Sequence, residues 1–297
     1  MIHLPPSATA PLGLLAAEAR SAGGRAWLVG GAVRDALLGR RPRDLDVAVE
    51  GRHGSVSALV LALRGKGWTR GAEHDRFGTA TLFAPEGVRF DLAEARSETY
   101  PVPGALPVVT PGVAIEEDLG RRDFSIHAMA VGLGDDGPGS PFLDPRSGVA
   151  DLGARTIRLL HGGSLADDPT RAFRAARYAA RLGFALAPGF DEAILAAAER
   201  GSFERISGDR LRRALSELLE DENRAEAFAI VARLGVTPLV VEGWRPRDEA
   251  LARLARATSP EESWEAVLSG VPSEVRGRIA DRLVLPRALR RAAGCPA

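Results

Sequence analysis

The sequence LVGGAVRDALLGRRPRDLDVAVEG, residues 28–51, decides the fold of the first part of this chain. An apolar strand is predicted over residues 26–29, and it ends at Gly30. A helix is predicted over residues 33–38, where apolar side chains come just before a glycine. Residues 45–49 alternate in polarity, which predicts a second strand. The stretch is therefore predicted to form a strand, a glycine turn, a helix and another strand.

Several residues of this stretch suit a phosphate group and a metal ion. Gly30 and Gly31 allow a polyphosphate to approach the backbone N–H groups at the helix start. Asp44 and Asp46 are spaced to project from one face of a strand, and Mg²⁺ prefers carboxylate and phosphate oxygens. Asp91, on a later predicted strand, is a candidate third carboxylate, although an ordinary strand-end aspartate fits equally well. These features predict nucleotidyl transfer; a helix cap with a solvated turn is the alternative.

The composition limits the class of protein. The chain has 297 residues, 45% of them hydrophobic, which suits two or three domains with a sizeable core. Its 39 basic and 39 acidic residues balance, so any surface for nucleic acid must be local. The single cysteine, Cys295, excludes a disulfide framework and favours a cytoplasmic location. No stretch approaches the roughly 20 apolar residues that span a membrane, so we expect no membrane partner.

Strands and helices alternate in the first part of the chain, whereas the second part is helical. The first part is further predicted to contain helices over 10–22 and 56–63 and a hairpin of strands over 77–83 and 88–93. The predicted helices of the second part cover 169–182, 189–200, 207–221, 223–235, 247–257, 260–269 and 272–282. Residues 99–113 are rich in proline and glycine and predict a long loop without a regular element. The join between the parts is expected within residues 145–165.

Two further charged motifs suit a nucleotide. In RRDFSIHAMA, residues 121–130, an arginine pair with Asp123 can bind a triphosphate and a ribose hydroxyl. The sequence DDPTRAFRAAR, residues 167–177, places four charged side chains three residues apart along one stripe of a helix: Asp168, Arg171, Arg174 and Arg177. A carboxylate with a guanidinium can match the edge of a base. A charged helix start would also explain the first motif, and an ion-paired helix face would explain the second.

Four motifs, in their order and spacing, resemble the class II tRNA nucleotidyltransferase and bacterial poly(A) polymerase family. They are GGAVRD-x8-DLD, RRDFSIHAMA, FLDPRSGVADL at 142–152 and DDPTRAFRAARYAARLGF at 167–184. The resemblance covers about residues 26–220 and implies an α+β fold, in which a head with a small mixed sheet precedes an all-α neck, body and tail. The implied parts are a nucleotidyltransferase head over 1–150, a base-recognising neck over 151–222 and a tRNA-binding body and tail over 223–297.

The resemblance also implies roles for residues of the motifs. Asp44 and Asp46 resemble the metal-binding carboxylates. The residues implied to lie against the nucleotide in the head are Gly30, Gly31, Arg34, Arg122 and Asp123, the last near the ribose. Asp168 and Arg171 resemble a protein template that pairs with the incoming base. The next nucleotide-binding arginines on that helix would be Arg174 and Arg177.

The chain departs from the family pattern at two motif positions. His127 stands where the family usually has asparagine, and Asp167 stands where it usually has glutamate. Asparagine and neutral histidine can both donate and accept a hydrogen bond, so a bond at position 127 can survive. The loop at 99–113 takes the place of a flexible loop that the family links to the switch from C to A addition.

The resemblance implies Mg²⁺-dependent addition of C and/or A to the tRNA 3′ end from CTP and ATP. Full CCA addition, CC addition, A addition and poly(A) synthesis stay open, as does the oligomeric state. A non-catalytic RNA-binding relative is the alternative from a different class, and the intact Asp44 and Asp46 argue against it. Residues 271–297 hold six arginines against two acidic residues. This basic end could follow the tRNA backbone, or it could be an ordinary solvated helix end.

Overall fold

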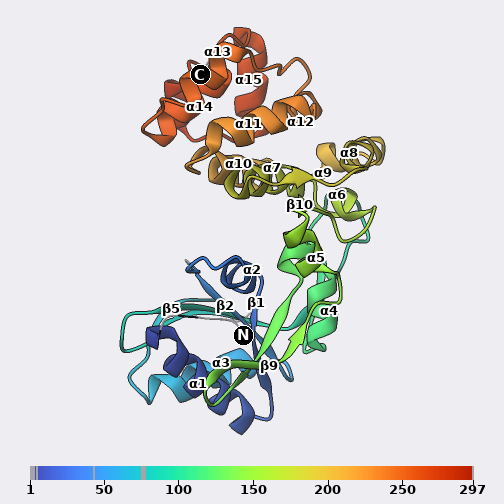
Figure 1. Ribbon diagram of the computed structural model, residues 1–297. Coiled ribbons are helices and arrows are strands. Elements are labelled where there is room, and N and C mark those ends of the chain that lie inside the picture. Colours follow the sequence, from blue (N-terminus) through green and yellow to red (C-terminus); the bar gives the residue numbers. More distant parts are fainter. Residues whose placement is uncertain (1–3, 5, 43, 75–77, 296–297) are drawn as a thin grey trace. The chain divides into compact units, whose positions relative to one another are not determined.

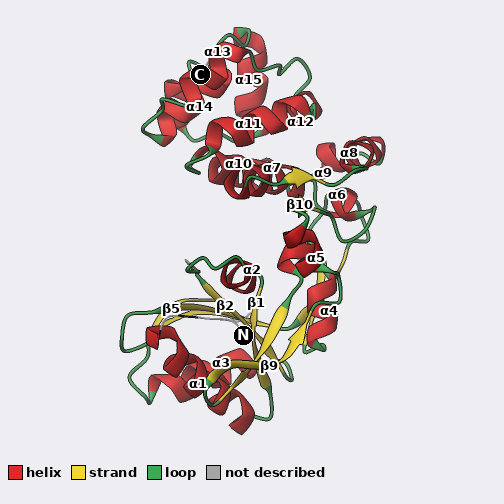
Figure 2. Cartoon of the chain, viewed as in Figure 1, coloured by secondary structure: helices red, strands yellow, loops and turns green. Residues whose placement is uncertain are grey.

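The chain divides into two compact units. A computed structural model describes residue 4 and residues 6–42, 44–74 and 78–295. One unit comprises Met1–Thr99 and Val108–Ala154, and the other comprises Tyr100–Pro107 and Arg155–Ala297. Figure 2 shows most of the strands in the first unit and mainly helices in the second. The predicted α+β fold class is therefore confirmed.

A seven-stranded mixed sheet forms the centre of the first unit. In spatial order its strands are β3 (Thr69–His74), β4 (Thr79–Phe83), β5 (Arg89–Glu94), β2 (Leu45–Glu50), β1 (Arg25–Val29), β8 (Ala130–Gly134) and β9 (Gly137–Leu143). The pair β2 and β5 is parallel, and the other neighbours are antiparallel. Because β1 lies inside the sheet, its residues 26–29 are buried, as their uninterrupted apolar sequence indicates. The predicted hairpin corresponds to β4 and β5, although residue 77 lies outside the described residues.

Helices lie on both faces of this sheet. The helices of the first unit are α1 (Pro6–Ser21), α2 (Gly31–Leu37), α3 (Ser55–Arg64), α4 (Ile115–Gly120), the 3₁₀ turn η2 (Ser125–His127) and α5 (Gly148–Gly153). Figure 1 shows α1 and α3 on one side of the sheet and α2 on the other. Leu12 and Leu15 of α1 and Leu59 and Leu63 of α3 are buried. The apolar core thus lies beneath α1 and α3, and α2 presents the glycine turn on the opposite side.

The proline- and glycine-rich stretch contains a strand that we did not predict. Strand β6 (Arg96–Thr99) pairs antiparallel with β7 (Val108–Pro111). The expectation of no regular element over 99–113 was therefore wrong at β7. Proline is tolerated there because Pro111 ends the strand of a two-stranded ladder, where no central hydrogen bond is lost.

The tip of the same stretch, residues 100–107, folds as part of the second unit. The backbone N–H of Gly104 donates to the carbonyl oxygen of Ala166 at 2.9 Å. Gly104 has a φ of +73°, and a Cβ there would lie 2.3 Å from the carbonyl oxygen of Ser202. Only glycine fits this close approach.

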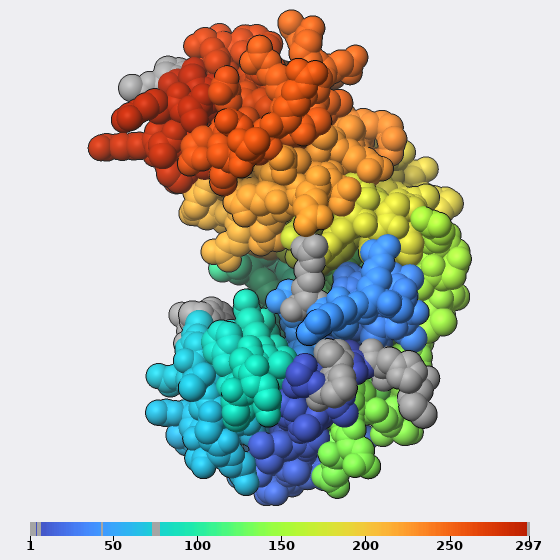
Figure 3. All heavy atoms as spheres, turned by 60° about the vertical axis from the view of Figure 1, so that its left-hand side comes forward, coloured from blue at the N-terminus to red at the C-terminus, as the bar shows by residue number. Residues whose placement is uncertain are grey.

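The second unit is a helical assembly with one short parallel ladder, β10 (Thr156–Ile157) with β11 (Ala185–Leu186). Its helices are α6 (Ser164–Asp167), α7 (Arg171–Leu182), α8 (Phe190–Glu199), α9 (Ser202–Arg205), α10 (Gly208–Leu219), α11 (Arg224–Arg233), α12 (Val236–Val240), α13 (Asp248–Leu254), α14 (Pro260–Leu268), α15 (Ser273–Arg282) and α16 (Arg287–Ala292). Helix α7 packs against α10 and α11, and α11 onward forms the continuous orange and red body of Figure 3. Phe228, Trp244 and Trp264 are fully buried within it.

All seven helices predicted for the second part are present. Four further helices, α6, α9, α12 and α16, were not predicted; each has only four to six residues. A segment of that length is too short to show helical periodicity.

Candidate active site

The turn between β1 and α2 brings the first two motifs together. Gly30 has φ +66° and ψ −130°, outside the usual range of residues with a side chain. A Cβ at this position would lie 2.8 Å from Nη1 of Arg122 and 3.8 Å from Oδ2 of Asp46. The missing side chain thus leaves room for a guanidinium beside the turn, with a carboxylate close by.

Arg34 is held at the start of α2. A Cβ on Gly31 would lie 3.5 Å from Nη2 of Arg34, so the guanidinium lies close to Gly31. Arg34 is only 4% exposed. It forms an ion pair with Asp35 at 2.8 Å and a 2.5 Å hydrogen bond to Nε2 of His127.

Arg122 is held by the buried carboxylate of Asp118, which was not among the predicted site residues. Nη2 of Arg122 lies 2.8 Å from Oδ2 of Asp118, and Nη2 of Arg121 lies 2.7 Å from Oδ1. Burial alone would raise the pKa of Asp118, but the Arg122 and Arg121 guanidinium groups outweigh it and lower the pKa. Asp118 therefore stays ionised. Its spacing of three and four residues from the two arginines was the available signal.

The carboxylate of Asp123 contacts both a backbone N–H group and a histidine ring, and its contact with a ribose stays a prediction. Its Oδ1 accepts the backbone N–H of Phe124 at 2.9 Å, as expected near a helix start, and also contacts Nδ1 of His127 at 2.8 Å. The residue that precedes η2 directly is Phe124. Asp123 therefore contacts His127, the same histidine that contacts Arg34.

The three predicted carboxylates lie on strand β2 or next to it. Asp46 lies on β2 beside its partner Asp91 on the parallel strand β5. Asp44 lies on a bend directly before β2 and is exposed, so it is not on the strand as predicted. Burial raises the pKa of Asp46; Arg122 and Arg34 oppose this rise, whereas Asp91 and Asp44 add to it.

Asp91 is partly neutralised by its neighbours. Its Oδ2 lies 2.9 Å from Nη2 of Arg89, and its Oδ1 accepts a hydrogen bond from Oγ1 of Thr81 at 2.6 Å. Asp91 is therefore an ion-paired aspartate within β5 that adds negative charge beside Asp46, and its role as a third carboxylate stays a prediction.

The donor chemistry of this cluster fits a hard divalent cation. Asp44 and Asp46 supply carboxylate oxygens, and a cation would offset the repulsion from Asp91 and Asp44 that adds to the effect of burial on the pKa of Asp46. Over residues 4, 6–42, 44–74 and 78–295, no three or more His, Cys, Asp or Glu side chains are gathered as a metal-binding group. The described protein groups thus provide charge and oxygen donors without a preassembled ligand cage.

Asp168 lies outside the helix on which we predicted it. Its backbone is extended, with φ −140° and ψ 97°, because the residue before a proline avoids the helical region. Oδ1 of Asp168 accepts the backbone N–H of Thr170 at 3.0 Å, and Oδ2 pairs with Nη2 of Arg210 at 3.1 Å. The predicted stripe of four helical side chains is therefore wrong at its first member.

The arginines of α7 have different surroundings. Arg171 is 6% exposed, and its Nη1 donates to Oγ of Ser164 at 2.5 Å. The guanidinium of Arg174 lies 5.7 Å from the ring centre of Tyr178. Arg177 forms ion pairs of 3.1 Å with Glu217 and Asp221. The ion-paired helix face therefore describes Arg177, while Arg171 lies beneath the surface next to Asp168.

Arg210 connects the loop tip to Asp168, a role that its sequence motif did not indicate. Its Nη1 donates to the carbonyl oxygens of Gly104 and Ala105 at 3.0 and 3.1 Å, while its Nη2 pairs with Asp168. Residues 106 positions apart in sequence meet here, and no local pattern could indicate that contact.

Most of the basic C-terminal end serves the fold of the second unit. Four of its arginines donate to backbone carbonyl oxygens: Arg276, Arg278, Arg282 and Arg290. Arg287 and Arg291 are exposed. The predicted contact with the tRNA backbone stays a prediction, and it rests on fewer arginines than the sequence indicated.

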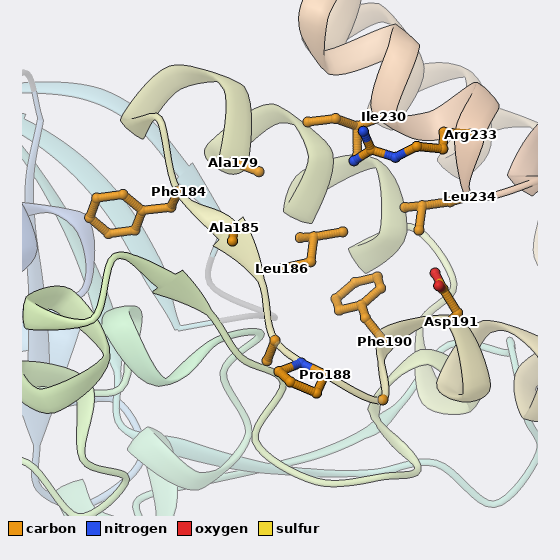
Figure 4. A pocket seen from close by; sticks show the side chains of 12 residues that line it. Ala179, Phe184, Ala185, Leu186, Pro188, Phe190, Asp191, Ile230, Arg233 and Leu234 are labelled. Atoms are coloured by element: carbon orange, nitrogen blue, oxygen red, sulfur yellow. The ribbon is translucent and has the colours of Figure 1, made fainter.

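A separate pocket of about 450 Å³ lies between β11, the start of α8 and α11. Figure 4 shows apolar side chains of Leu186, Phe190 and Ile230 around it, with Arg233 and Asp191 among the charged lining residues. None of these is a predicted site residue.

In the described part of the chain, the helices lack the length and apolar character needed to cross a membrane.

Gly30→Ala is expected to destabilise the protein by about 1–3 kcal/mol, because φ is positive and ψ lies outside the left-handed helical region. The new Cβ would also displace Nη1 of Arg122. Urea unfolding and nucleotide titration would measure the two effects. Gly39→Ala is the control, since φ is +69° there but no atom lies within 4 Å of the added Cβ. Equal nucleotide affinities in the two variants would contradict the role given to Gly30.

Comparison with known proteins places this geometry in a family. The model of the poly(A) polymerase head domain matches residues 26–158. An A-adding tRNA nucleotidyltransferase of Geobacter sulfurreducens is 39% identical over 210 residues, covering 71% of this chain and 23% of the relative. A CC-adding tRNA nucleotidyltransferase of Deinococcus radiodurans is 48% identical over 162 residues, covering 54% of this chain and 42% of the relative. The chain thus spans less than half the length of these two relatives.

A solved structure extends the match to nearly the whole chain. The structure of a CCA-adding enzyme in apo form II aligns with a TM-score of 0.83 and 31% sequence identity. The alignment covers 97% of this chain and 70% of that one. Both the sequence motifs and the fold therefore agree: the chain belongs to the class II tRNA nucleotidyltransferase family.

Proposed function

We propose that this chain adds C and/or A residues to the 3′ end of tRNA, using CTP and ATP with Mg²⁺. The observation that carries the proposal is the meeting of Arg122 and Asp46 at Gly30, with Arg34 at the adjoining helix start. Two guanidinium groups beside a carboxylate suit a triphosphate with its metal ion. The names of the two relatives, one A-adding and one CC-adding, support tRNA as the acceptor.

Arg34 and Arg122 would orient the phosphates through N–H groups, and Asp118 keeps Arg122 in place for this contact. Asp44 and Asp46 would hold the metal ion. When bound, Mg²⁺ lowers the pKa of an attacking hydroxyl and neutralises charge on a leaving pyrophosphate. The protein contribution is then mostly alignment and charge stabilisation, as in other phosphoryl transfers.

The direct test uses the purified chain with Mg²⁺ and labelled CTP or ATP. The acceptors are tRNA lacking the whole CCA end, tRNA lacking only the terminal A, complete tRNA and an unrelated RNA. We expect extension of an incomplete tRNA and none of complete tRNA, and the nucleotide incorporated distinguishes CCA, CC and A addition. Long A tails on the unrelated RNA would indicate poly(A) synthesis instead. No incorporation into either incomplete tRNA would contradict the proposal.

Asp168→Asn is expected to weaken discrimination among CTP, ATP, GTP and UTP. An amide replaces one acceptor with a donor, and the proposed base contact would lose about 1–3 kcal/mol of discrimination. The measurement is kcat/KM for each nucleotide. Asp191→Asn, an exposed position on α8, is the matched control. A nucleotide profile that matches this control would count against a template role for Asp168.

A further inference from the structure

His127 links the second motif to the first through both of its ring nitrogens. Nδ1 lies 2.8 Å from Oδ1 of Asp123, and Nε2 lies 2.5 Å from Nη1 of Arg34. The histidine is 5% exposed, and Asp123 and Arg34 are also buried. The ring therefore spans from the segment before η2 to helix α2.

The two partners determine the protonation of the ring. An arginine guanidinium only donates hydrogen bonds, so Nε2 must offer a lone pair to Arg34. An ionised carboxylate only accepts, so Nδ1 must carry the proton toward Asp123. His127 is therefore neutral with its proton on Nδ1; a proton on Nε2 would point at the guanidinium.

We infer that His127 is a positioning residue that holds the Arg34 guanidinium at the helix start. Asp35 engages Nε and Nη2 of Arg34, and His127 engages Nη1, so the guanidinium is held on two sides. A group held in this way loses less freedom when it binds a phosphate. The inference deepens the proposed function and rests on it for the contact between Arg34 and nucleotide.

Asparagine and glutamine separate the two contacts of His127. The terminal atoms of asparagine stand about as far from Cβ as Nδ1 does, whereas those of glutamine reach about as far as Nε2. His127→Asn therefore keeps a donor for Asp123 and loses the acceptor for Arg34. His127→Gln retains an acceptor for Arg34 and loses the bond to Asp123. The asparagine is also the residue usual in the family, so this variant is expected to fold.

We expect His127→Asn to raise the KM for the nucleotide by about 10-fold or more, as for loss of a hydrogen bond to a charged group. The kcat is expected to change less. His127→Gln is expected to stay close to the native KM, because Arg34 keeps its partner. His53→Asn is the matched control, since His53 is exposed and pairs with Glu94 outside the site. Equal KM changes in the Asn and Gln variants, or no change in either, would overturn the inference.

A spectroscopic measurement tests the contact without any activity. In a ¹⁵N NMR spectrum of the labelled protein, the His127 signals are identified by their loss in His127→Asn. At neutral pH we expect a protonated Nδ1 and an unprotonated Nε2. A proton on Nε2 would overturn the inference. A native protein that shows this tautomer but incorporates no nucleotide would instead count against the proposed function, so the two failures are distinguishable.

Discussion

Asp46→Asn is expected to lower nucleotide incorporation by about 10³-fold, because the metal ion that it would help to hold contributes several kcal/mol of charge stabilisation. The substitution keeps the size of the side chain and removes its charge. Single-turnover incorporation into an incomplete tRNA at saturating Mg²⁺ is the measurement. Asp136→Asn, at an exposed position in the turn between β8 and β9, is the control for effects of expression and purification on activity.

The same variant is expected to be as stable as the native protein at neutral pH, or more stable. Burial raises the pKa of Asp46, so the folded protein binds this proton more tightly than the unfolded chain does. The ionised carboxylate therefore costs stability at neutral pH, and the cost disappears as the pH falls through the raised pKa toward 3.8. The neutral amide of the variant has no such cost. Near-native turnover, or unfolding of the variant at neutral pH, would refute this account of Asp46.

Asp118→Asn is expected to destabilise the first unit by about 3–5 kcal/mol, the usual cost of removing one partner from a buried ion pair. Asp118 is 1% exposed and accepts hydrogen bonds from Arg121 and Arg122. The amide would leave Arg122 without this anion, whereas Arg121 keeps its ion pair with Glu98. Urea unfolding measures the loss, and the KM for nucleotide should rise as well, because Arg122 is no longer held beside Gly30.

The contribution of Asp118 has a defined pH dependence. Its pKa is lowered in the folded protein, so its contribution is fully present above the ordinary value of 3.8 and is lost as the pH falls through the lowered value. The stability of Asp118→Asn should lack this acid-dependent part. Glu117→Gln, at an exposed position on the same helix, is the control. If both variants unfold at the same urea concentration at neutral pH, the buried pair does not have the importance assigned to it.

Local patterns were sufficient to predict the elements around the glycine turn. The apolar residues 26–29, the helix after Gly31 and the strand that carries Asp46 occur where their sequences indicate. Each is indicated by side chains that lie within a few residues of one another along the chain. The strand β7 was missed because proline and glycine argued against it locally, whereas pairing with β6 stabilises it.

For the site, too, local sequence identified residues but not their contacts. The motifs indicated Arg34, Arg122 and Asp46, whereas the groups that hold these side chains could not be predicted. Asp118 and Arg210 were overlooked, and Asp168 was placed on the wrong element, since Pro169 keeps it extended. The predicted stripe over residues 168–177 required one continuous helix. In the structure Asp168 lies outside α7, and Arg171 is buried.

By itself the sequence determined the class of fold, the elements around the glycine turn, the longer helices of the second unit and the chemical groups available for binding phosphate and metal. Hydrophobic periodicity and glycine or proline punctuation are local properties, so the chain order contains them. Only the tertiary structure decided which groups meet. Asp91 beside Asp46, Arg210 between Gly104 and Asp168, and His127 against Arg34 are contacts between distant segments. Sheet register and helix packing bring them together, and neither can be deduced from the spacing of residues within one motif.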